Sequence, residues 1–305
     1  LEVEEGSRNC LGLATHKGYY RYKRLPFGVS FAPKKFQKTM DAILTGVPNV
    51  AWYLDDIILG GRTEEEHFNA IGEVLARLDK AGIRTQEAKC KWLQRSVKYL
   101  GHVLDENGIQ PVKEQIEAIA KMPPPGNVQE LKSFLGTVNY YSRFIDNLQS
   151  ECAPLHSLTR QGLKWKWTTE AGEAFQKLKQ KISEAGALVH YSLQVPLGVS
   201  ADDSGKGVGA VLWHRFPGGE EKPIAYASRV LNQAETRYSA IDREALALVF
   251  AVKKFDQYLR GREFILRTDH KPLMRILSEE REIPKIAANR LIRWALILRS
   301  YNFKV

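Results

Sequence analysis

Two adjacent carboxylates, Asp55 and Asp56, stand in the middle of an apolar run, AWYLDDIIL (residues 51–59). A buried strand does not tolerate one unpaired charge, and two charges of like sign are costlier still. The run therefore predicts a tight hairpin that turns at the two aspartates and projects their carboxylates at its tip. Carboxylates on a rigid hairpin suit a hard cation such as Mg²⁺, and a solvated Asp-Asp turn is the alternative.

A second group of acids occurs in the last third of the chain. Asp202 lies near the end of a predicted strand, Glu244 lies at the edge of the apolar face of a long predicted helix, and Asp269 closes the predicted strand EFILRTD (263–269). Three acids in this order, on a strand, a helix and a strand end, form a recognisable arrangement of carboxylates. For Glu244 alone, the alternative is a side chain that reaches solvent or pairs with a lysine. The glycines at 205, 207 and 209 are predicted to form a hairpin turn, because no helix follows them.

The composition sets limits on the class of protein. The 305 residues allow about two domains, and 44% hydrophobic with 26% charged residues indicate a globular chain. Lys and Arg number 45 against 35 for Asp and Glu, and this net charge of +10 favours a polyanionic partner such as nucleic acid. The three cysteines form no CxxC pair, which predicts free thiols in a reducing compartment and no zinc site. No stretch predicts a membrane span or a signal peptide, and Leu1 in place of Met indicates a piece of a longer product.

Local signals predict the elements that must position the acids. Thr63 and Asn127 are predicted N-caps, each with Glu three residues later, and Gly82 is expected to end the helix that Thr63 begins. A β-hairpin is expected around residues 105–108. Further helices are predicted over residues 34–44, 170–185, 239–259 and 286–298.

Four segments together resemble the reverse transcriptases of gypsy-type LTR retrotransposons. They are YLDD (53–56), LPFGVSFAPKKFQKTMD (25–41), KYLGHVLDENGIQP (98–111) and ELKSFLGTVNYYSRFI (130–145). Three more resemble the ribonuclease H domain of the same elements: ADDSGKGVGAVL (201–212), YSAIDREALALVFAVKKFDQYLRG (238–261) and LRTDHKPL (266–273). The resemblance implies an α+β chain with a partial fingers and palm region (1–98), a helical thumb (99–160) and a connecting segment (161–194). A ribonuclease H-like α/β domain with a mixed five-stranded sheet (195–305) would follow.

The resemblance also implies roles for single residues. Asp55 and Asp56 would hold the metals of nucleotidyl transfer, and Asp202, Glu244 and Asp269 those of RNA cleavage, with Mg²⁺ or Mn²⁺ as the cofactor. Residues expected near the template, the primer or the incoming nucleotide are Phe27, Gly28, Gln37, Tyr53, Tyr99, Leu100 and Gly101. Basic residues expected to contact phosphates are Lys34, Lys35, Lys38, Lys132, Arg143, Lys164, Lys166, Arg229 and Lys271.

The function that the resemblance implies is RNA-directed DNA synthesis with ribonuclease H activity by two-metal phosphoryl transfer. The expected partners are an RNA/DNA hybrid or template-primer, deoxynucleoside triphosphates, and a protease and an integrase in the same polyprotein. The expected location is the cytoplasm, within virus-like particles, with the nucleus as the alternative. The family's other polymerase aspartate would precede Leu1 and its fourth ribonuclease H acid would follow Val305, so this stretch alone is expected not to polymerise. The competing hypothesis is a non-catalytic nucleic-acid-binding or scaffold protein derived from such an element.

Overall fold

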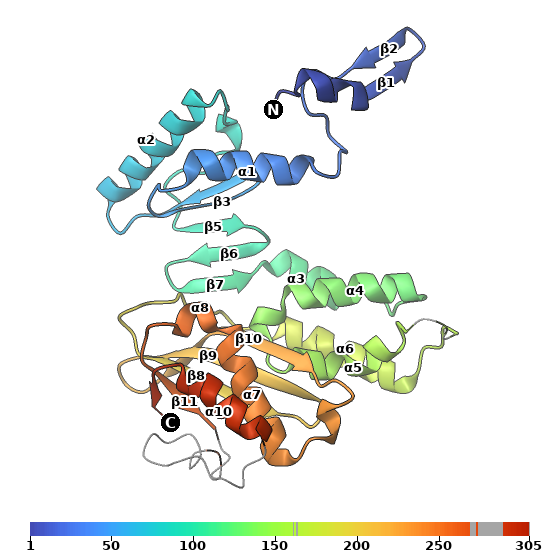
Figure 1. Cartoon of the computed structure of the whole chain (residues 1–305), viewed down its shortest axis with the longest axis vertical. Helices are drawn as coiled ribbons and strands as arrows, with labels where there is room; N and C mark the ends of the chain where they lie inside the picture. The colour runs from blue at the N-terminus through green and yellow to red at the C-terminus, as the bar shows by residue number, and fades with distance from the viewer. Residues whose placement is uncertain (161, 163, 269–272, 274–288, 305) are drawn as a thin grey trace. The chain divides into compact units, whose positions relative to one another are not determined.

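The computed structural model describes residues 1–160, 162, 164–268, 273 and 289–304. The chain divides into two compact units, Leu1–Gln94 and Arg95–Val305. Figure 1 labels most of the helices and strands of both units. Within the described residues, no helix is both long enough and apolar enough to cross a membrane.

In the first unit, two helices pack against a short hairpin. Helices α1 (Ala32–Leu44) and α2 (Glu64–Lys80) contact each other and the antiparallel strands β3 (Val50–Tyr53) and β4 (Asp56–Leu59). Their common core consists of Met40, Leu44, Val47, Val74 and Leu78. The remaining elements of this unit are η1 (Glu5–Cys10), β1 (Gly12–Thr15), β2 (Gly18–Arg21) and η2 (Glu87–Lys89).

The predicted helix signals of the first unit are confirmed. The Thr63 hydroxyl accepts a hydrogen bond of 3.2 Å from the Glu66 N–H, which satisfies one of the backbone donors that a helix start leaves unpaired. Gly82 follows the end of α2 with a φ of 68°, the left-handed conformation that glycine adopts without strain.

The second unit begins with a three-stranded meander and a group of helices. Strands β5 (Ser96–Tyr99), β6 (His102–Asp105) and β7 (Gly108–Pro111) are antiparallel, so the hairpin predicted at 105–108 is confirmed and the structure adds a second turn at Leu100 and Gly101. Helices α3 (Lys113–Ala120), α4 (Val128–Tyr140), α5 (Leu148–Ser157) and α6 (Thr169–Ser183) follow, with η3 (Ser142–Phe144) between α4 and α5. The members of their shared core include Leu131, Phe134, Leu148, Leu155, Phe175 and Leu178.

A mixed five-stranded sheet completes the unit, as predicted. Its order is β10-β9-β8-β11-β12, with β8, β9 and β10 antiparallel and β11 parallel to both β8 and β12. The strands are β8 (Leu197–Asp203), β9 (Gly207–Arg215), β10 (Glu221–Val230), β11 (Phe264–Arg267) and β12 (Phe303–Lys304). The remaining elements are η4 (Glu235–Arg237), α7 (Ala240–Lys254), α8 (Asp256–Leu259) and α10 (Asn289–Arg299).

Helix α7 packs on β8 and β9, and α10 packs on α7. The apolar side chains between α7 and the sheet form the largest core of the chain's described part, with Val199, Leu212, Leu248 and Val252 among its members. The helix predicted over 239–259 is not continuous, because α7 ends at Lys254 and α8 begins at Asp256. Ser239 caps α7 by accepting a hydrogen bond from the Asp242 N–H.

A short extended segment joins the meander to the large sheet. Ile109 of β7 and Leu188 exchange two backbone hydrogen bonds of 2.8 and 2.9 Å, and the Val189 N–H then donates to the Pro223 carbonyl of β10. Gly108 lies so close to this segment that a Cβ atom there would stand 1.9 Å from the Leu188 carbonyl oxygen. Glycine is therefore required at 108 for the close approach of two backbones.

Candidate active sites

The first acid pair lies on the β3–β4 hairpin, and its turn differs from the predicted one. Tyr53 pairs directly with Asp56, so Leu54 and Asp55 are the two turn residues and Asp56 is the first residue of β4. Leu54 has a φ of 50°, a conformation that non-glycine residues seldom adopt. The predicted turn at Asp55 and Asp56 was thus one residue too late, although both carboxylates are exposed at the hairpin tip.

Side chains from α1 and β3 hold this turn in place. The Gln37 side-chain oxygen accepts a hydrogen bond of 2.7 Å from the Leu54 N–H. The Asp41 carboxylate accepts from the Gln37 amide at 2.8 Å and from the Trp52 indole at 2.9 Å. Gln37, predicted to lie near substrate, therefore also supports the backbone that carries Asp55. The supporting roles of Asp41 and Trp52 were not predicted, because the bond between them joins residues 11 positions apart in the chain.

The aromatic and glycine residues predicted near substrate are accessible in this unit. Phe27 is fully exposed, and Gly28 beside it has a φ of 84°. Tyr53, which precedes the turn, is 55% exposed. Single exposed apolar side chains are common on protein surfaces, so this exposure makes the residues accessible but assigns them no ligand. Their contacts with a template or nucleotide stay a prediction.

The second predicted contact region is the β5–β6 turn. Tyr99 pairs with His102, and both turn residues between them, Leu100 and Gly101, have positive φ angles of 43° and 68°. The Tyr140 hydroxyl of α4 donates to the Leu100 carbonyl, and the His102 Nδ1 lies 2.6 Å from the same oxygen. The turn is therefore fixed to α4, and burial raises the pKa of the Tyr140 phenol.

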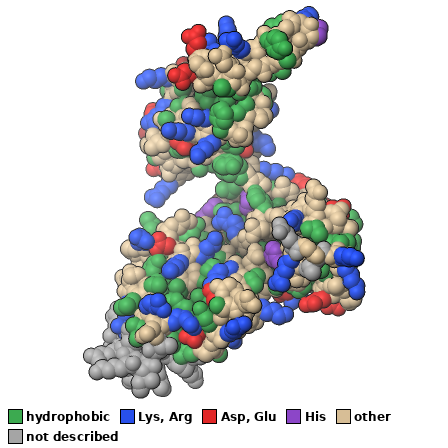
Figure 2. Space-filling model, turned by 45° about the vertical axis from the view of Figure 1, so that its right-hand side comes forward, with side chains coloured by type: hydrophobic (Ala, Val, Ile, Leu, Met, Phe, Trp, Pro, Cys, Tyr) green, Lys and Arg blue, Asp and Glu red, His purple; other side chains and the backbone are tan. Residues whose placement is uncertain are grey.

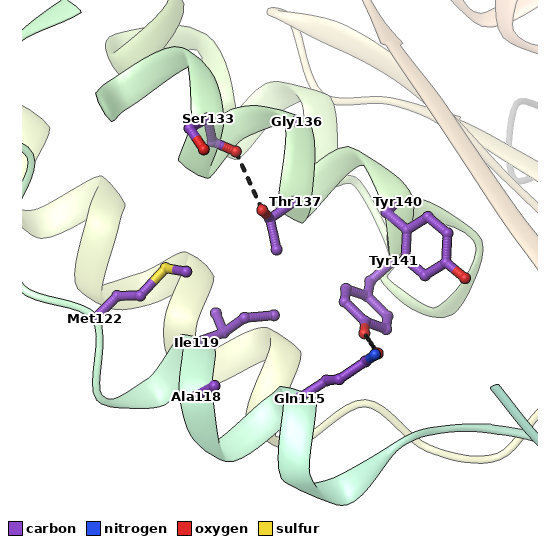
Figure 3. A pocket seen from close by; sticks show the side chains of 9 residues that line it. All are labelled: Gln115, Ala118, Ile119, Met122, Ser133, Gly136, Thr137, Tyr140 and Tyr141. Carbon is purple, nitrogen blue, oxygen red and sulfur yellow. Dashed lines mark hydrogen bonds between the residues drawn. The ribbon is translucent and has the colours of Figure 1, made fainter. Parts of the chain in front are cut away.

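An open cavity of about 600 Å³ lies between α3 and α4 (Figure 3). Ile119 on α3 and Met122, which follows that helix, line one side, and the small residues Ser133, Gly136 and Thr137 of α4 line the other. A Cβ atom at Gly136 would meet nothing within 4 Å. We call this feature the α3–α4 groove. Because the residues on the α4 side of the groove are small, a large ligand could approach the backbone of α4 closely.

The second acid group is only partly described. Asp202 is exposed near the end of β8, and Glu244 is half-buried in α7, which packs on β8. Asp269 lies outside the described residues, as does Lys271. Among the residues that the structure does describe, no three His, Cys, Asp or Glu side chains are grouped so that they could hold a metal ion.

An ion pair joins β8 to α7 one residue away from each predicted acid. The Arg243 Nε lies 2.6 Å from the Asp203 carboxylate, whose side chain is only 5% exposed. A second bond from Arg243 reaches the Tyr238 carbonyl at 2.9 Å. Asp203, a residue not counted among the predicted ligands, is thus committed to holding strand and helix together.

Two other predicted features have clear outcomes. Arg229, expected to contact phosphate, makes a bidentate ion pair with Glu235 at 2.7 and 2.9 Å, so its charge is already neutralised.

Cys10, Cys90 and Cys152 are free thiols, as predicted. Burial raises the pKa of the Cys152 thiol to about 12.

The β3–β4 hairpin and most of the mixed sheet each lie in a segment that matches a known family model. A family model described as reverse transcriptase (RNA-dependent DNA polymerase) matches residues 7–104, and one described as an RNase H-like domain found in reverse transcriptase matches residues 192–301. The chain belongs to the reverse transcriptase–ribonuclease H family of Ty3/gypsy-type retrotransposons.

Curated relatives and solved structures agree with this assignment. The Tf2-7 and Tf2-3 transposon polyproteins of Schizosaccharomyces pombe are each 31% identical to this chain over 309 aligned residues. These matches cover 100% of this chain but only 23% of each polyprotein. A foamy viral protease-reverse transcriptase dRH in complex with double-stranded DNA has a TM-score of 0.82 at 24% identity, covering 99% of this chain and 53% of that one. The foamy viral protease-reverse transcriptase with an RNA/DNA hybrid has a TM-score of 0.77 at 25% identity, covering 99% and 41%.

Proposed function

We propose that this chain is the part of a retrotransposon polyprotein that copies RNA into DNA and degrades the copied RNA. Asp55 and Asp56 would serve nucleotidyl transfer, and Asp202, Glu244 and Asp269 would serve RNA cleavage. The observation that carries the proposal is the exposed acid pair on the β3–β4 hairpin, inside a segment that the reverse transcriptase family model matches. The family match over residues 192–301 supports the second activity in the same way.

The donor set of the hairpin fits a hard divalent cation. Mg²⁺ is commonly held by one or two carboxylates together with water and substrate phosphates, and adjacent exposed aspartates offer that arrangement. Mg²⁺ or Mn²⁺, when bound, would neutralise phosphate charge and activate a hydroxyl or water. The chain's own contribution is to keep the Asp55 backbone fixed through Gln37 and Asp41.

The proposed substrates are an RNA/DNA hybrid or template-primer and deoxynucleoside triphosphates. The net charge of +10 supports a polyanionic partner, and Lys and Arg side chains are spread over the face shown in Figure 2. The α3–α4 groove would admit the sugar-phosphate edge of a duplex, because Gly136 leaves the helix backbone accessible. A protease and an integrase are the proposed neighbours of this chain in the polyprotein. The proposed location is the cytoplasm, within virus-like particles, with the nucleus as the alternative.

The two activities can be separated in the polymerase–ribonuclease H enzyme released from the parent polyprotein. Asp55→Asn with Asp56→Asn should abolish primer extension and leave RNA cleavage in a hybrid intact. Asp202→Asn or Glu244→Gln should do the reverse. A wild-type enzyme that binds hybrid but neither extends nor cleaves would favour the scaffold hypothesis, and unchanged activities in these variants would refute the assigned roles.

A further inference from the structure

A second cavity, of about 420 Å³, lies between α5 and the end of β10. Its polar lining consists of Gln149, His156, Ser157, Arg160, Ser228 and Arg229. Ala153 and Val230 supply its apolar part, and no carboxylate is among the described residues that line it. We call it the α5–β10 cavity.

The chemistry of this cavity suits an anion. The Arg160 guanidinium has no hydrogen-bond or ion-pair partner in the described part of the chain, whereas Arg229 is neutralised by Glu235. Burial lowers the pKa of His156, which favours the neutral ring, and a neutral imidazole keeps one N–H donor. One unneutralised guanidinium beside neutral donors matches the oxygens of a single phosphate.

The position of the cavity relates it to the predicted ribonuclease H acids. Asp202 pairs with Gly209 on β9, and Gly209 pairs with Ser228 on β10, so the three residues form one row across the sheet. Ser228 lines the cavity, and two strand spacings, roughly 10 Å, separate its backbone from that of Asp202. The start of α5 covers Gly209 in the middle of this row, so a nucleic-acid strand with one phosphate at Asp202 would pass around that helix start to bring a further phosphate near the cavity.

Contacts between α5 and the sheet fix the cavity before any ligand arrives. The Gln149 N–H donates to the Ser228 hydroxyl at 3.0 Å, and the hydroxyls of Ser150 and Ser204 lie 2.9 Å apart. At Gly209 a Cβ atom would lie 1.9 Å from the Asn147 side-chain oxygen, so the helix start sits directly on β9. A preformed site loses less entropy when it binds.

We propose that the α5–β10 cavity binds a backbone phosphate of the nucleic-acid strand that passes Asp202, with Arg160 as the charged contact and His156 as a donor. The Ser157 hydroxyl lines the cavity but already donates to the Pro154 carbonyl at 2.6 Å. The site rests on the proposed function, because it serves to align the same substrate. With this contact, helix α5 as well as the ribonuclease H-like sheet would position the nucleic-acid strand at the predicted ribonuclease H acids.

The test measures binding of an RNA/DNA hybrid to the chain at several salt concentrations. Arg160→Gln should weaken binding roughly fivefold at low salt and reduce the slope of log affinity against log salt by about one. Arg160→Lys should keep most of that slope. Arg260→Gln is the matched control, because Arg260 is exposed, pairs with Asp256, and follows α8, which is not among the elements that line the cavity.

Hybrids that carry one uncharged methylphosphonate at successive positions locate the contact. The wild-type chain should lose affinity at one position, and Arg160→Gln should remove that particular loss while Arg260→Gln keeps it. Equal effects of the two variants would overturn the cavity proposal while hybrid binding itself survives. No hybrid binding by the wild-type chain would overturn the proposed function as well, and competition by inorganic phosphate without a position-dependent loss would show a site for the free ion instead.

Discussion

The side-chain oxygen of Gln37 on α1 accepts a hydrogen bond of 2.7 Å from the backbone N–H of Leu54, the residue before Asp55. This bond joins a helix to a hairpin turn 17 positions later in the chain. Leu54 has a φ of 50°, so the turn carries strain that outside contacts must balance. The conformation of the acid pair therefore depends on α1.

Gln37→Met should loosen this turn without disturbing the core. Loss of one hydrogen bond worth about 1 kcal/mol should make the Leu54 amide exchange with solvent roughly fivefold faster, as measured by hydrogen exchange. Gln94→Met is the control, because the Gln94 side chain donates to the Trp92 carbonyl two residues away. An unchanged exchange rate at Leu54 would show that the bond does not support the turn.

Alanine at two glycines should change stability in opposite directions. Gly108→Ala should destabilise the fold by about 1–3 kcal/mol, because the new Cβ would meet the Leu188 carbonyl and the backbones must separate. Gly136→Ala should stabilise it by about 0.5–1 kcal/mol, because Gly136 lies within α4 with open space in front of it. Urea denaturation measures both free energies of unfolding.

The same Gly136→Ala variant tests the α3–α4 groove. A methyl group there narrows the small-residue side of the groove, so hybrid binding should weaken although the protein becomes more stable. Full affinity in a stabilised Gly136→Ala chain would exclude a close approach of nucleic acid at this helix.

Removing one partner of the Asp203–Arg243 ion pair should cost more stability than removing both partners. Arg243→Met leaves the carboxylate of Asp203, a side chain only 5% exposed, without its charged partner and should cost about 3 kcal/mol. The double variant Arg243→Met with Asp203→Asn should recover part of this loss, because it buries no unpaired charge. Thermal and urea unfolding of the wild type, Arg243→Met, Asp203→Asn and the double variant measure the four free energies of unfolding. Additive losses would contradict a direct interaction.

Glu221 should make stability depend on acid pH. Hydrogen bonds from Arg267 and then from Arg215 lower its pKa from 4.5 to about 2 in the folded chain. Since the folded pKa is lower than the unfolded one, the stabilisation is complete above pH 4.5 and disappears as the pH falls through about 2. Glu221→Gln should thus be less stable than wild type at pH 7, and the difference should shrink between pH 4.5 and 2. A constant difference over this range would contradict the ion pairs.

Local sequence signals predicted much of the fold. The caps at Thr63 and Asn127 and the end of α2 before Gly82 are confirmed. The hairpin turn predicted for the glycines is confirmed at Gly205, whereas Gly207 and Gly209 lie in β9. These features depend on contacts within three or four residues, which a single sequence displays directly. The five-stranded sheet followed from the family resemblance and not from periodicity.

Errors and omissions occurred where distant residues decide the backbone. The turn at Leu54 and Asp55 was placed one residue late, since Gln37 selects the strained conformation at Leu54. The turn at Leu100 and Gly101 was missed, because its positive φ angles are fixed by Tyr140 of α4. The long helix was predicted without its break at Phe255.

The sequence by itself determined which acids, glycines and basic residues the chain carries, and their motif order identified the family. Tertiary structure alone decided which polar groups already have partners within the chain. Asp203 forms an ion pair with Arg243, Arg229 forms one with Glu235, and Gln37 accepts a hydrogen bond from Leu54. It also revealed the α5–β10 cavity, whose lining comes from segments about 70 residues apart. The physical reason is that motif spacing records local chemistry, whereas pairing and burial arise only when the core brings distant segments together.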